Sequence, residues 1–169
     1  MSLFSGSDSS GEPPAPLPSD LAHRAAVTDL VHAFGLCIDR RDWVRYRTLF
    51  AETVEVDYQP RKPGIPTGEI PSEQWAVGAA ACFEQIPATQ HTITVSEVTI
   101  DGDEAVVTSN LAARHHDPGC TGDPLFTEFS RYTHRCRLSD DGWQLTAVHC
   151  EVLFTEGNKA VLYDKMSDE

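Results

Sequence analysis

Two histidines and one aspartate are the residues best suited to move protons in this sequence. A neutral imidazole, with an unperturbed pKa near ~6.5, can remove a proton from a carbon next to a carbonyl group at neutral pH. His91 and His115 are the candidates for that role. Asp39 ends a predicted helix, where the helix dipole disfavours a carboxylate, and such a local cost often marks a site. A carboxylate beside a histidine fixes its tautomer and favours its charged form. Together these residues indicate general acid–base chemistry.

The apolar pattern predicts that the two histidines share the inner face of a β-hairpin. Apolar residues alternate along residues 91–100, but their phase changes near Ser96, which predicts a β-bulge there. With that bulge, His91 pairs with Ala113 on the returning strand, and His115 lies one step further on the same face. The two imidazoles would then be diagonal neighbours, ~7–8 Å apart, at the open end of an apolar surface.

A second predicted hairpin supplies the rest of this inner surface. A two-residue turn at Asp140-Asp141 places one row of each strand on the same face: Ser130, Tyr132, His134, Cys136 and Leu138, then Trp143, Leu145, Ala147, His149 and Glu151. The surface is apolar at one end and polar at the other, which is typical of a ligand pocket. The predicted substrate-binding residues are Ser130, Tyr132 and His149 from the strands, with Phe34 and Trp75 from the helices.

The elements that carry these residues come in a definite order, with helices first and strands afterwards. Helices are predicted over 21–40, 43–50 and 72–83, and strands over 53–58, 91–100, 104–115, 125–138 and 143–154. This order predicts an α+β domain, a cone of helices packed on one face of a curved antiparallel sheet. We expect a disordered tail over 1–19, the domain over 20–155, and a C-terminal extension over 156–169 that either covers the pocket or frays.

Composition excludes several classes of function. The 169 residues include 26 acidic and 13 basic ones, and a net charge of -13 repels nucleic acids and anionic membranes. The five cysteines form no CxxC pair, which argues against a disulfide framework or a thiolate zinc site. The histidines lack HxH or HExxH spacing, and the sequence has no Gly-rich phosphate loop, so we expect neither a metal nor an organic cofactor. With no secretory signal or membrane span, we expect a cytoplasmic protein whose partner is a small-molecule substrate.

Several short motifs occur in an order that resembles a known family. They are Asp39-Arg40-Arg41-Asp42-Trp43, Leu49-Phe50 leading into Val56-Asp57-Tyr58, Thr89-Gln90-His91, the Asp101-Gly102-Asp103 turn and the strand-ending His115. From about Asp20 to Phe154 the chain resembles the SnoaL-like branch of the nuclear transport factor two-like superfamily, and within it the scytalone dehydratase-like proteins. Members of the superfamily are commonly homodimers or homotrimers, so we expect a homo-oligomer.

The resemblance implies a cone that holds a hydroxylated carbonyl compound without a cofactor. His91 and His115 match the two catalytic histidines of the family, and Asp39 matches the carboxylate that pairs with the second of them, His115. Tyr58 matches a tyrosine that holds a water on the substrate carbonyl, and Ser130 matches a polar pocket residue. Ile38 and Tyr132 stand where the family has a tyrosine and an asparagine.

The resemblance therefore predicts a dehydratase for a cyclic, polyketide-like hydroxycarbonyl compound. Three alternatives remain open at the level of the sequence. Two are a cyclase and an isomerase of natural-product biosynthesis, and the third is a non-catalytic binding or assembly subunit on the same fold.

Overall fold

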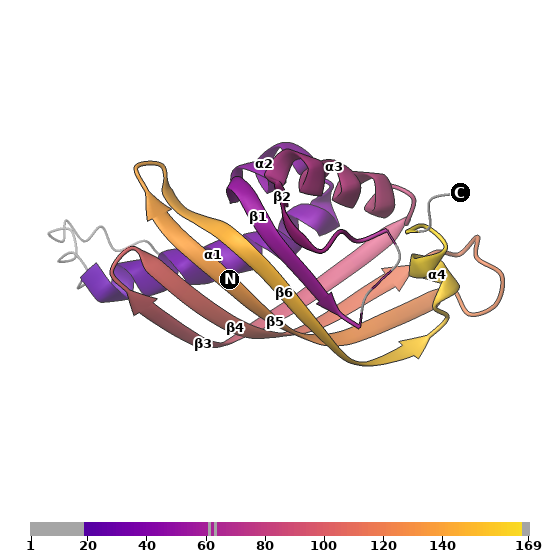
Figure 1. Cartoon of the computed structure of the whole chain (residues 1–169). Coiled ribbons are helices and arrows are strands. Elements are labelled where there is room, and N and C mark those ends of the chain that lie inside the picture. Colours follow the sequence, from indigo (N-terminus) through magenta and orange to yellow (C-terminus); the bar gives the residue numbers. More distant parts are fainter. Residues whose placement is uncertain (1–18, 61, 63, 167–169) are drawn as a thin grey trace, which may run out of the picture.

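The computed structural model describes residues 19–60, 62 and 64–166 (Figure 1). Its helices are α1 (Ser19–Arg40), α2 (Trp43–Thr48), α3 (Ser72–Phe83) and α4 (Ala160–Tyr163). Its strands are β1 (Phe50–Gln59), β2 (Gly68–Pro71), β3 (Ala88–Asp101), β4 (Glu104–His116), β5 (Leu125–Ser139) and β6 (Gly142–Gly157). The predicted order of helices and long strands is confirmed. The short β2 and α4 were not predicted, and the tail predicted over 1–19 falls, up to residue 18, outside the described residues.

The strands form one sheet in the order β2-β1-β6-β5-β4-β3. All neighbours are antiparallel except β1 and β6, which are parallel. The sheet curves, and the helices α1, α2 and α3 lie against one of its faces (Figure 1). The predicted α+β fold class, a cone of helices on a curved, mainly antiparallel sheet, is therefore confirmed.

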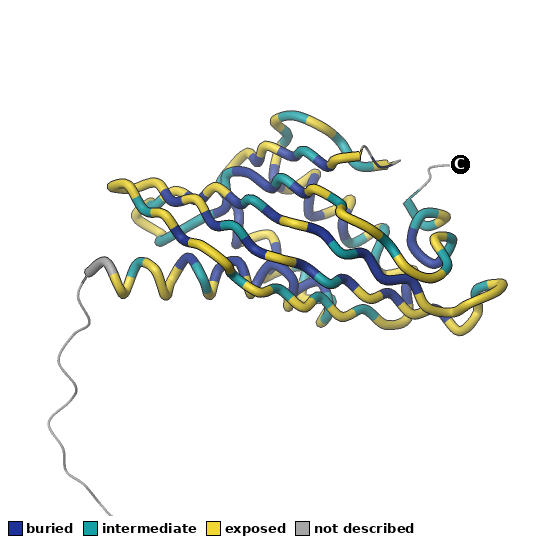
Figure 2. Tube along the Cα trace, turned by 90° about the horizontal axis from the view of Figure 1, so that it is seen from below, coloured by how far each residue is buried: buried dark blue, intermediate teal, exposed yellow. Residues whose placement is uncertain are grey.

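The core lies between α1 and the inner face of this sheet. The apolar stripe of α1 is buried at each position expected for a period of 3.6 residues: Val27, Leu30, Val31, Phe34, Cys37 and Ile38. Along the strands, buried and exposed residues alternate, which is visible as dark blue and yellow segments in Figure 2. This alternation turns every second side chain of β4 and β5 toward α1 and the space beneath it.

The first hairpin has the register that the apolar pattern predicts. The pairing of β3 with β4 shifts between Val95 and Glu97, so Ser96 is the extra residue of a β-bulge. His91 pairs with Ala113, and Thr89 pairs with His115. The two histidines therefore lie on the same inner face.

The second hairpin differs from the prediction because β6 contains an unpredicted bulge. Leu145 pairs with Cys136 and Ala147 pairs with Arg135, which leaves Thr146 as an extra residue. One inserted residue reverses the alternation that follows it, here as far as Leu153, which is the extra residue of a second bulge that restores the phase. The predicted inward positions of His149 and Glu151 are therefore wrong, since both side chains lie on the outer face of the sheet.

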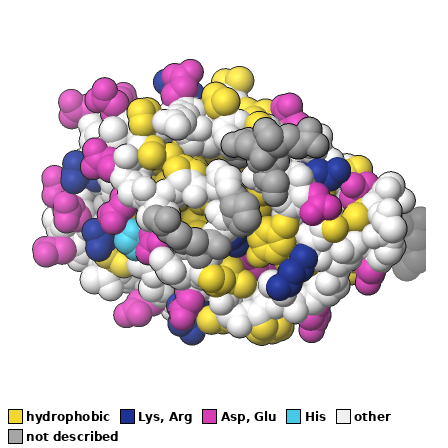
Figure 3. Space-filling view, turned by 45° about the vertical axis from the view of Figure 1, so that its right-hand side comes forward, with side chains coloured by type: hydrophobic (Ala, Val, Ile, Leu, Met, Phe, Trp, Pro, Cys, Tyr) yellow, Lys and Arg dark blue, Asp and Glu magenta, His cyan; other side chains and the backbone are white. Residues whose placement is uncertain are grey.

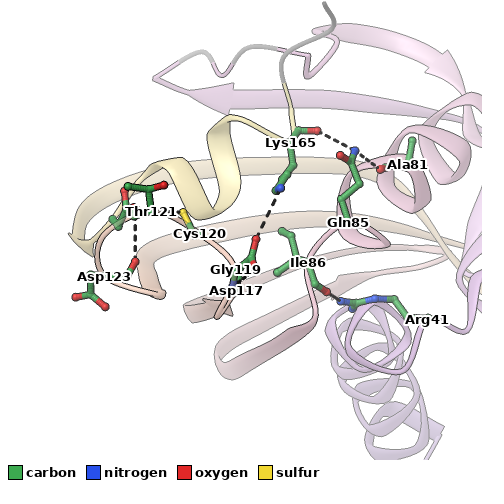
Figure 4. Close-up of polar contacts among 11 residues, drawn as sticks. Arg41, Ala81, Gln85, Ile86, Asp117, Gly119, Cys120, Thr121, Asp123 and Lys165 are labelled. Carbon is green, nitrogen blue, oxygen red and sulfur yellow. Dashed lines mark hydrogen bonds and ion pairs between the residues drawn. The ribbon is translucent and has the colours of Figure 1, made fainter.

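The segment after β6 folds back over one end of the cone. Lys165 Nζ lies 3.7 Å from an Asp117 carboxylate oxygen, and Gln85 Nε2 donates to the Ala81 carbonyl at 2.8 Å and to the Lys165 carbonyl at 3.5 Å (Figure 4). Leu162 of α4 is buried in a small apolar cluster with Ile86 and Phe126. These contacts hold α4 against the ends of α3 and β4.

On one side of the molecule, hydrophobic and acidic side chains occupy different parts of the surface (Figure 3). Hydrophobic side chains gather toward the middle of this side, and acidic side chains lie mostly around its margin (Figure 3). Within the described ranges, no helix is both long and apolar enough to cross a membrane.

Candidate active site

A cavity of about 580 Å³ lies between α1, α3 and the inner face of the sheet. Six of the predicted site residues line it, namely Phe34, Tyr58, Trp75, His91, His115 and Tyr132. They come from two helices and four strands, so the fold brings together positions spread over almost a hundred residues of sequence.

Asp39 pairs with His91 and not with His115. His91 Nδ1 lies 2.7 Å from Asp39 Oδ1, and the backbone N–H of His91 donates to Oδ2 at 2.8 Å. Thr89 Oγ1 donates to Oδ1 at 2.9 Å. The predicted Asp39–His115 dyad is therefore wrong. The physical reason is that α1 ends beside the first residues of β3, the strand that carries His91, which leaves His115 one strand further away.

The charge of this dyad follows from its surroundings. Burial raises the pKa of Asp39, but the hydrogen bonds and charge of His91 outweigh burial and leave that pKa below its usual value. The carboxylate is thus ionised at neutral pH and accepts the Nδ1–H of His91. Because Nδ1 is engaged, Nε2 on the opposite side of the ring is the nitrogen available to the cavity that His91 lines.

Arg41, the first residue after α1, forms the C-terminal cap of that helix and supports the Asp39–His91 dyad. The N–H groups of Arg41 and Asp42 donate to the carbonyls of Ile38 and Cys37, the pattern of a Schellman motif. Arg41 takes the left-handed position of that motif with φ 57°, where glycine is usual. Its guanidinium turns back and donates to the Ile86 carbonyl at 2.7 Å (Figure 4). It also donates to Thr89 Oγ1 at 2.9 Å. Arg41 therefore helps to orient the hydroxyl that donates to Asp39.

Gly35 allows α1 to approach the strand that carries His91. A Cβ atom at this position would lie 2.9 Å from His91 Cβ and 2.9 Å from Ile93 Cδ1. Gly35 is also one helical turn before Asp39, so both residues face β3. A glycine inside a helix costs about 0.5–1 kcal/mol relative to alanine, and here the close approach explains its presence.

His115 sits in an aromatic sandwich. Its ring stacks on Phe83 and Phe126, with centroids 6.0 and 5.9 Å away, and lies 5.8 Å from the ring of His91. Burial, followed by the charges of His91 and Lys62, lowers the pKa of His115 to about 3. His115 is therefore neutral at physiological pH. It can donate or accept a hydrogen bond in the cavity, but it is not an imidazolium and so does not serve as a general acid in the resting state.

Two tyrosine hydroxyls, from β1 and β5, face each other in the lining of the cavity. The Tyr58 and Tyr132 oxygens lie 3.3 Å apart, and either hydroxyl can donate to the other. Burial raises the pKa of both well above the usual value, so both stay protonated. Tyr58 is thus able to donate to a water or a carbonyl oxygen, and the role that the family resemblance implies for it stays a prediction.

An ion pair that the sequence did not reveal also lines the cavity. Lys62 Nζ lies 2.6 Å from each carboxylate oxygen of Glu128. Ser130, a predicted substrate-binding residue, lies behind this pair and donates to Glu128 Oε1 at 3.1 Å. Glu128 has the same strand phase as Ser130 and Tyr132, a signal that was present in the sequence. No such signal marks Lys62, which lies between β1 and β2.

The remaining predicted residue, His149, contributes to a different surface. It lies on the outer face of the sheet, where its Nε2 is 3.5 Å from Glu55.

Burial raises the pKa of Cys82, which lines the main cavity, to about 11, so that residue is a thiol and not a thiolate. Among the described residues, no group of three or more His, Cys, Asp or Glu could hold a metal ion.

Comparisons with known proteins agree with this fold. The family model described as a SnoaL-like domain matches residues 19–149. No curated protein is significantly similar to the chain in sequence.

Among solved structures, the Kfla4162 protein from Kribbella flavida is similar, with 23% identity, a TM-score of 0.78, and 85% of this chain and 99% of that one covered. A putative scytalone dehydratase from Novosphingobium aromaticivorans has 17% identity and a TM-score of 0.68, covering 82% of this chain and 89% of that one. A putative dehydratase of the NTF2-like family from Streptomyces avermitilis has 21% identity and a TM-score of 0.65, covering 79% and 98%. At these identities the likeness establishes a shared fold.

Proposed function

The chain belongs to the SnoaL-like domain family, and from that premise we propose that it is a cofactor-independent lyase. Its substrate is a cyclic, polyketide-like compound with a hydroxyl group β to a carbonyl, and its reaction is the loss of water. The observation that carries this proposal is the Asp39–His91 hydrogen bond of 2.7 Å, because His91 lines a cavity whose walls combine apolar and polar side chains. Solved structures of the same fold named as putative dehydratases support the reaction class.

The proposed reaction is a proton abstraction followed by an elimination. Nε2 of His91 takes the proton from the carbon between the carbonyl and the hydroxyl-bearing carbon, and the electron pair moves to the carbonyl oxygen as an enolate. The electron pair then returns and expels the hydroxyl group. This hydroxyl takes the proton from the His91 imidazolium and leaves as water, so that His91 is neutral again.

The other cavity residues bind and orient the substrate. Tyr58 holds a water on the substrate carbonyl, and Tyr132 fixes the direction of the Tyr58 hydroxyl. His115 is neutral because its pKa is about 3, so it accepts or donates a hydrogen bond at the leaving hydroxyl and does not act as the resting acid. Phe34 and Trp75 contact the apolar body of the substrate. General acid–base catalysis supplies only ~10²–10⁴-fold, so orientation must contribute much of the rest.

A dehydration assay with a model substrate tests this proposal. The compound 3-hydroxy-1-tetralone loses water and tautomerises to the fluorescent 1-naphthol. We expect turnover by the purified protein and a loss of about 10²–10⁴-fold in His91→Ala. The control is His32→Ala, which removes an exposed histidine from the solvent side of α1 and should leave turnover unchanged. If His91→Ala and His32→Ala turned over equally fast, His91 would not be the base.

A further inference from the structure

The Lys62–Glu128 ion pair is the most unusual feature that the proposed acid–base reaction leaves without a role. The two side chains are only 5% and 4% exposed. Removing two charges from water costs free energy that their mutual attraction often fails to recover, and apolar residues of similar size are frequently as stable. A pair kept inside a cavity at that cost is a candidate for function, provided that its geometry leaves something for a ligand to use.

The geometry leaves one hydrogen-bond donor of Lys62 for the cavity. An ammonium group has three N–H donors, and the two oxygens of Glu128 engage two of them. Within the described part of the chain, Nζ has no further hydrogen-bond acceptor. Nζ also lies 5.1 Å from the ring centroid of Tyr58, the residue proposed to act at the substrate carbonyl. Lys62 and Tyr58 thus belong to the same side of the cavity.

The charge balance indicates what kind of group this donor serves. Glu128 compensates the charge of Lys62, and a second carboxylate on a ligand would meet the nearby negative charge of Glu128. An uncharged carbonyl oxygen meets no such repulsion. When the oxygen becomes an enolate, its new charge strengthens the bond to the ammonium only at that stage, which is the condition for lowering the barrier.

We infer that Lys62 is the oxyanion-stabilising residue of this cavity and that Glu128 holds it in place, which makes the substrate an uncharged carbonyl compound. This inference rests on the proposed function. The free N–H of Lys62 donates to the carbonyl oxygen while His91 removes the proton from the adjacent carbon. A hydrogen bond from a charged donor is about twice as strong as one from a neutral hydroxyl, so Lys62 contributes more here than Tyr58. Glu128 is a positioning residue, since it acts through Lys62.

A bound phenol reports this donor without any turnover. The probe is 4-nitro-1-naphthol, a bicyclic phenol whose anion is coloured and resembles an enolate. Absorbance titration gives the pKa of the bound probe in the wild type and in Lys62→Met. We expect this pKa to be at least one unit higher in Lys62→Met, a tenfold or greater change in the ionisation equilibrium.

Two further variants make the result independent of folding and of net charge. Lys62→Met leaves Glu128 buried without a partner, so the double variant Lys62→Met with Glu128→Gln replaces the ion pair by a neutral pair of unchanged total charge. It should still raise the pKa of the bound probe above the wild-type value, although by less than Lys62→Met, in which the unpaired charge of Glu128 also opposes the probe anion. Lys159→Met, which removes an exposed lysine, should leave that pKa at the wild-type value.

The outcomes separate this inference from the proposed function. An equal probe pKa in the wild type and the double variant overturns the role of Lys62, as does a wild type that binds the probe no better than the double variant. If His91-dependent dehydration of 3-hydroxy-1-tetralone is nevertheless found, the proposed function stands without Lys62. A raised probe pKa in both variants, with no dehydration in the wild type, supports Lys62 as the oxyanion donor and overturns the proposed reaction.

Discussion

Replacing Asp39 by asparagine is the most direct test of the dyad, because every group that contacts this carboxylate donates to it. Oδ2 accepts the backbone N–H of His91 at 2.8 Å, and Oδ1 accepts from Thr89 at 2.9 Å and from His91 Nδ1 at 2.7 Å. In Asp39→Asn, an amide nitrogen at the Oδ2 position would meet the backbone N–H donor. The amide therefore turns so that its nitrogen faces His91 Nδ1 and donates to it.

That rotation inverts the tautomer of His91. When Nδ1 becomes the acceptor, the ring proton moves to Nε2, which faces the cavity and then has no lone pair to act as a base. The full contribution of the general base is lost, so kcat should fall by about 10²–10⁴-fold, equivalent to roughly 3–5 kcal/mol in the barrier. KM should change little, because Asp39 lies behind His91 and its side chain is only 18% exposed. The free energy of unfolding should fall by about 1–2 kcal/mol through the loss of charge-assisted hydrogen bonds.

The assay is the steady-state dehydration of 3-hydroxy-1-tetralone, with urea denaturation as the measure of stability. The matched control is Asp42→Asn, three residues away, where the carboxylate accepts the Arg45 N–H at 3.1 Å and caps α2. This control should lose up to about 1 kcal/mol of stability and keep its kcat. A folded Asp39→Asn with wild-type kcat would refute the argument that Asp39 sets the His91 tautomer.

Three further predictions concern packing, pH and the end of α1. Gly35→Ala should lower the free energy of unfolding, measured by urea denaturation, by about 1–3 kcal/mol and should reduce turnover, because its Cβ would lie 2.9 Å from His91 Cβ. The control is Gly78→Ala, whose Cβ would have no atom within 4 Å and whose free energy of unfolding should rise by about 0.4–1 kcal/mol. Burial, followed by the charge of His149, lowers the pKa of His134 to about 3, so the unfolded chain binds a proton near ~6.5 that the folded chain does not. The free energy of unfolding that this difference contributes above pH ~6.5 is therefore lost on acidification. Between pH 7 and pH 5, the free energy of unfolding of His134→Phe should fall by about 2 kcal/mol less than that of the wild type. Parallel plots of unfolding free energy against pH for the two proteins would contradict this expectation. Arg41→Gly should relieve the strain of the positive φ at this residue, yet it should reduce kcat roughly tenfold, because Thr89 and with it the Asp39–His91 pair would be held less firmly. Arg40→Ala is the control and should keep the wild-type kcat in steady-state kinetics.

The two hairpins show why one register was predictable and the other was not. In β3 the apolar phase changes at Ser96, so the bulge was visible as a break in the alternation. In β6 the bulge at Thr146 falls beside Leu145, Ala147 and Val148, three apolar residues that look alike in either phase. Without a visible break, His149 was predicted to face inward. A β-bulge can be predicted only where inward and outward residues differ in polarity.

The polar parts of the site were predictable to different degrees. The strand register brings His91 and His115 to one face, but it does not state which of them the end of α1 reaches, and Asp39 was assigned to the wrong one. Lys62 follows β1 in a segment without periodicity, so no pattern could place its ammonium group in the cavity. Its partner Glu128 could have been found from strand phase. What sequence patterns miss here is contact between elements that no periodic signal relates.

Three local rules of helix design are broken within seven residues at the end of α1, and all three exceptions serve His91. Gly35 weakens the helix interior, Asp39 places a negative charge at the negative end of the helix dipole, and Arg41 takes a left-handed conformation that favours glycine. Each costs on the order of 1 kcal/mol locally. Gly35 lets β3 come close, Asp39 binds Nδ1, and Arg41 holds the threonine that also donates to Asp39. Because three independent costs converge on one imidazole, selection for the orientation of that ring explains them together, whereas selection for stability alone would remove each of them.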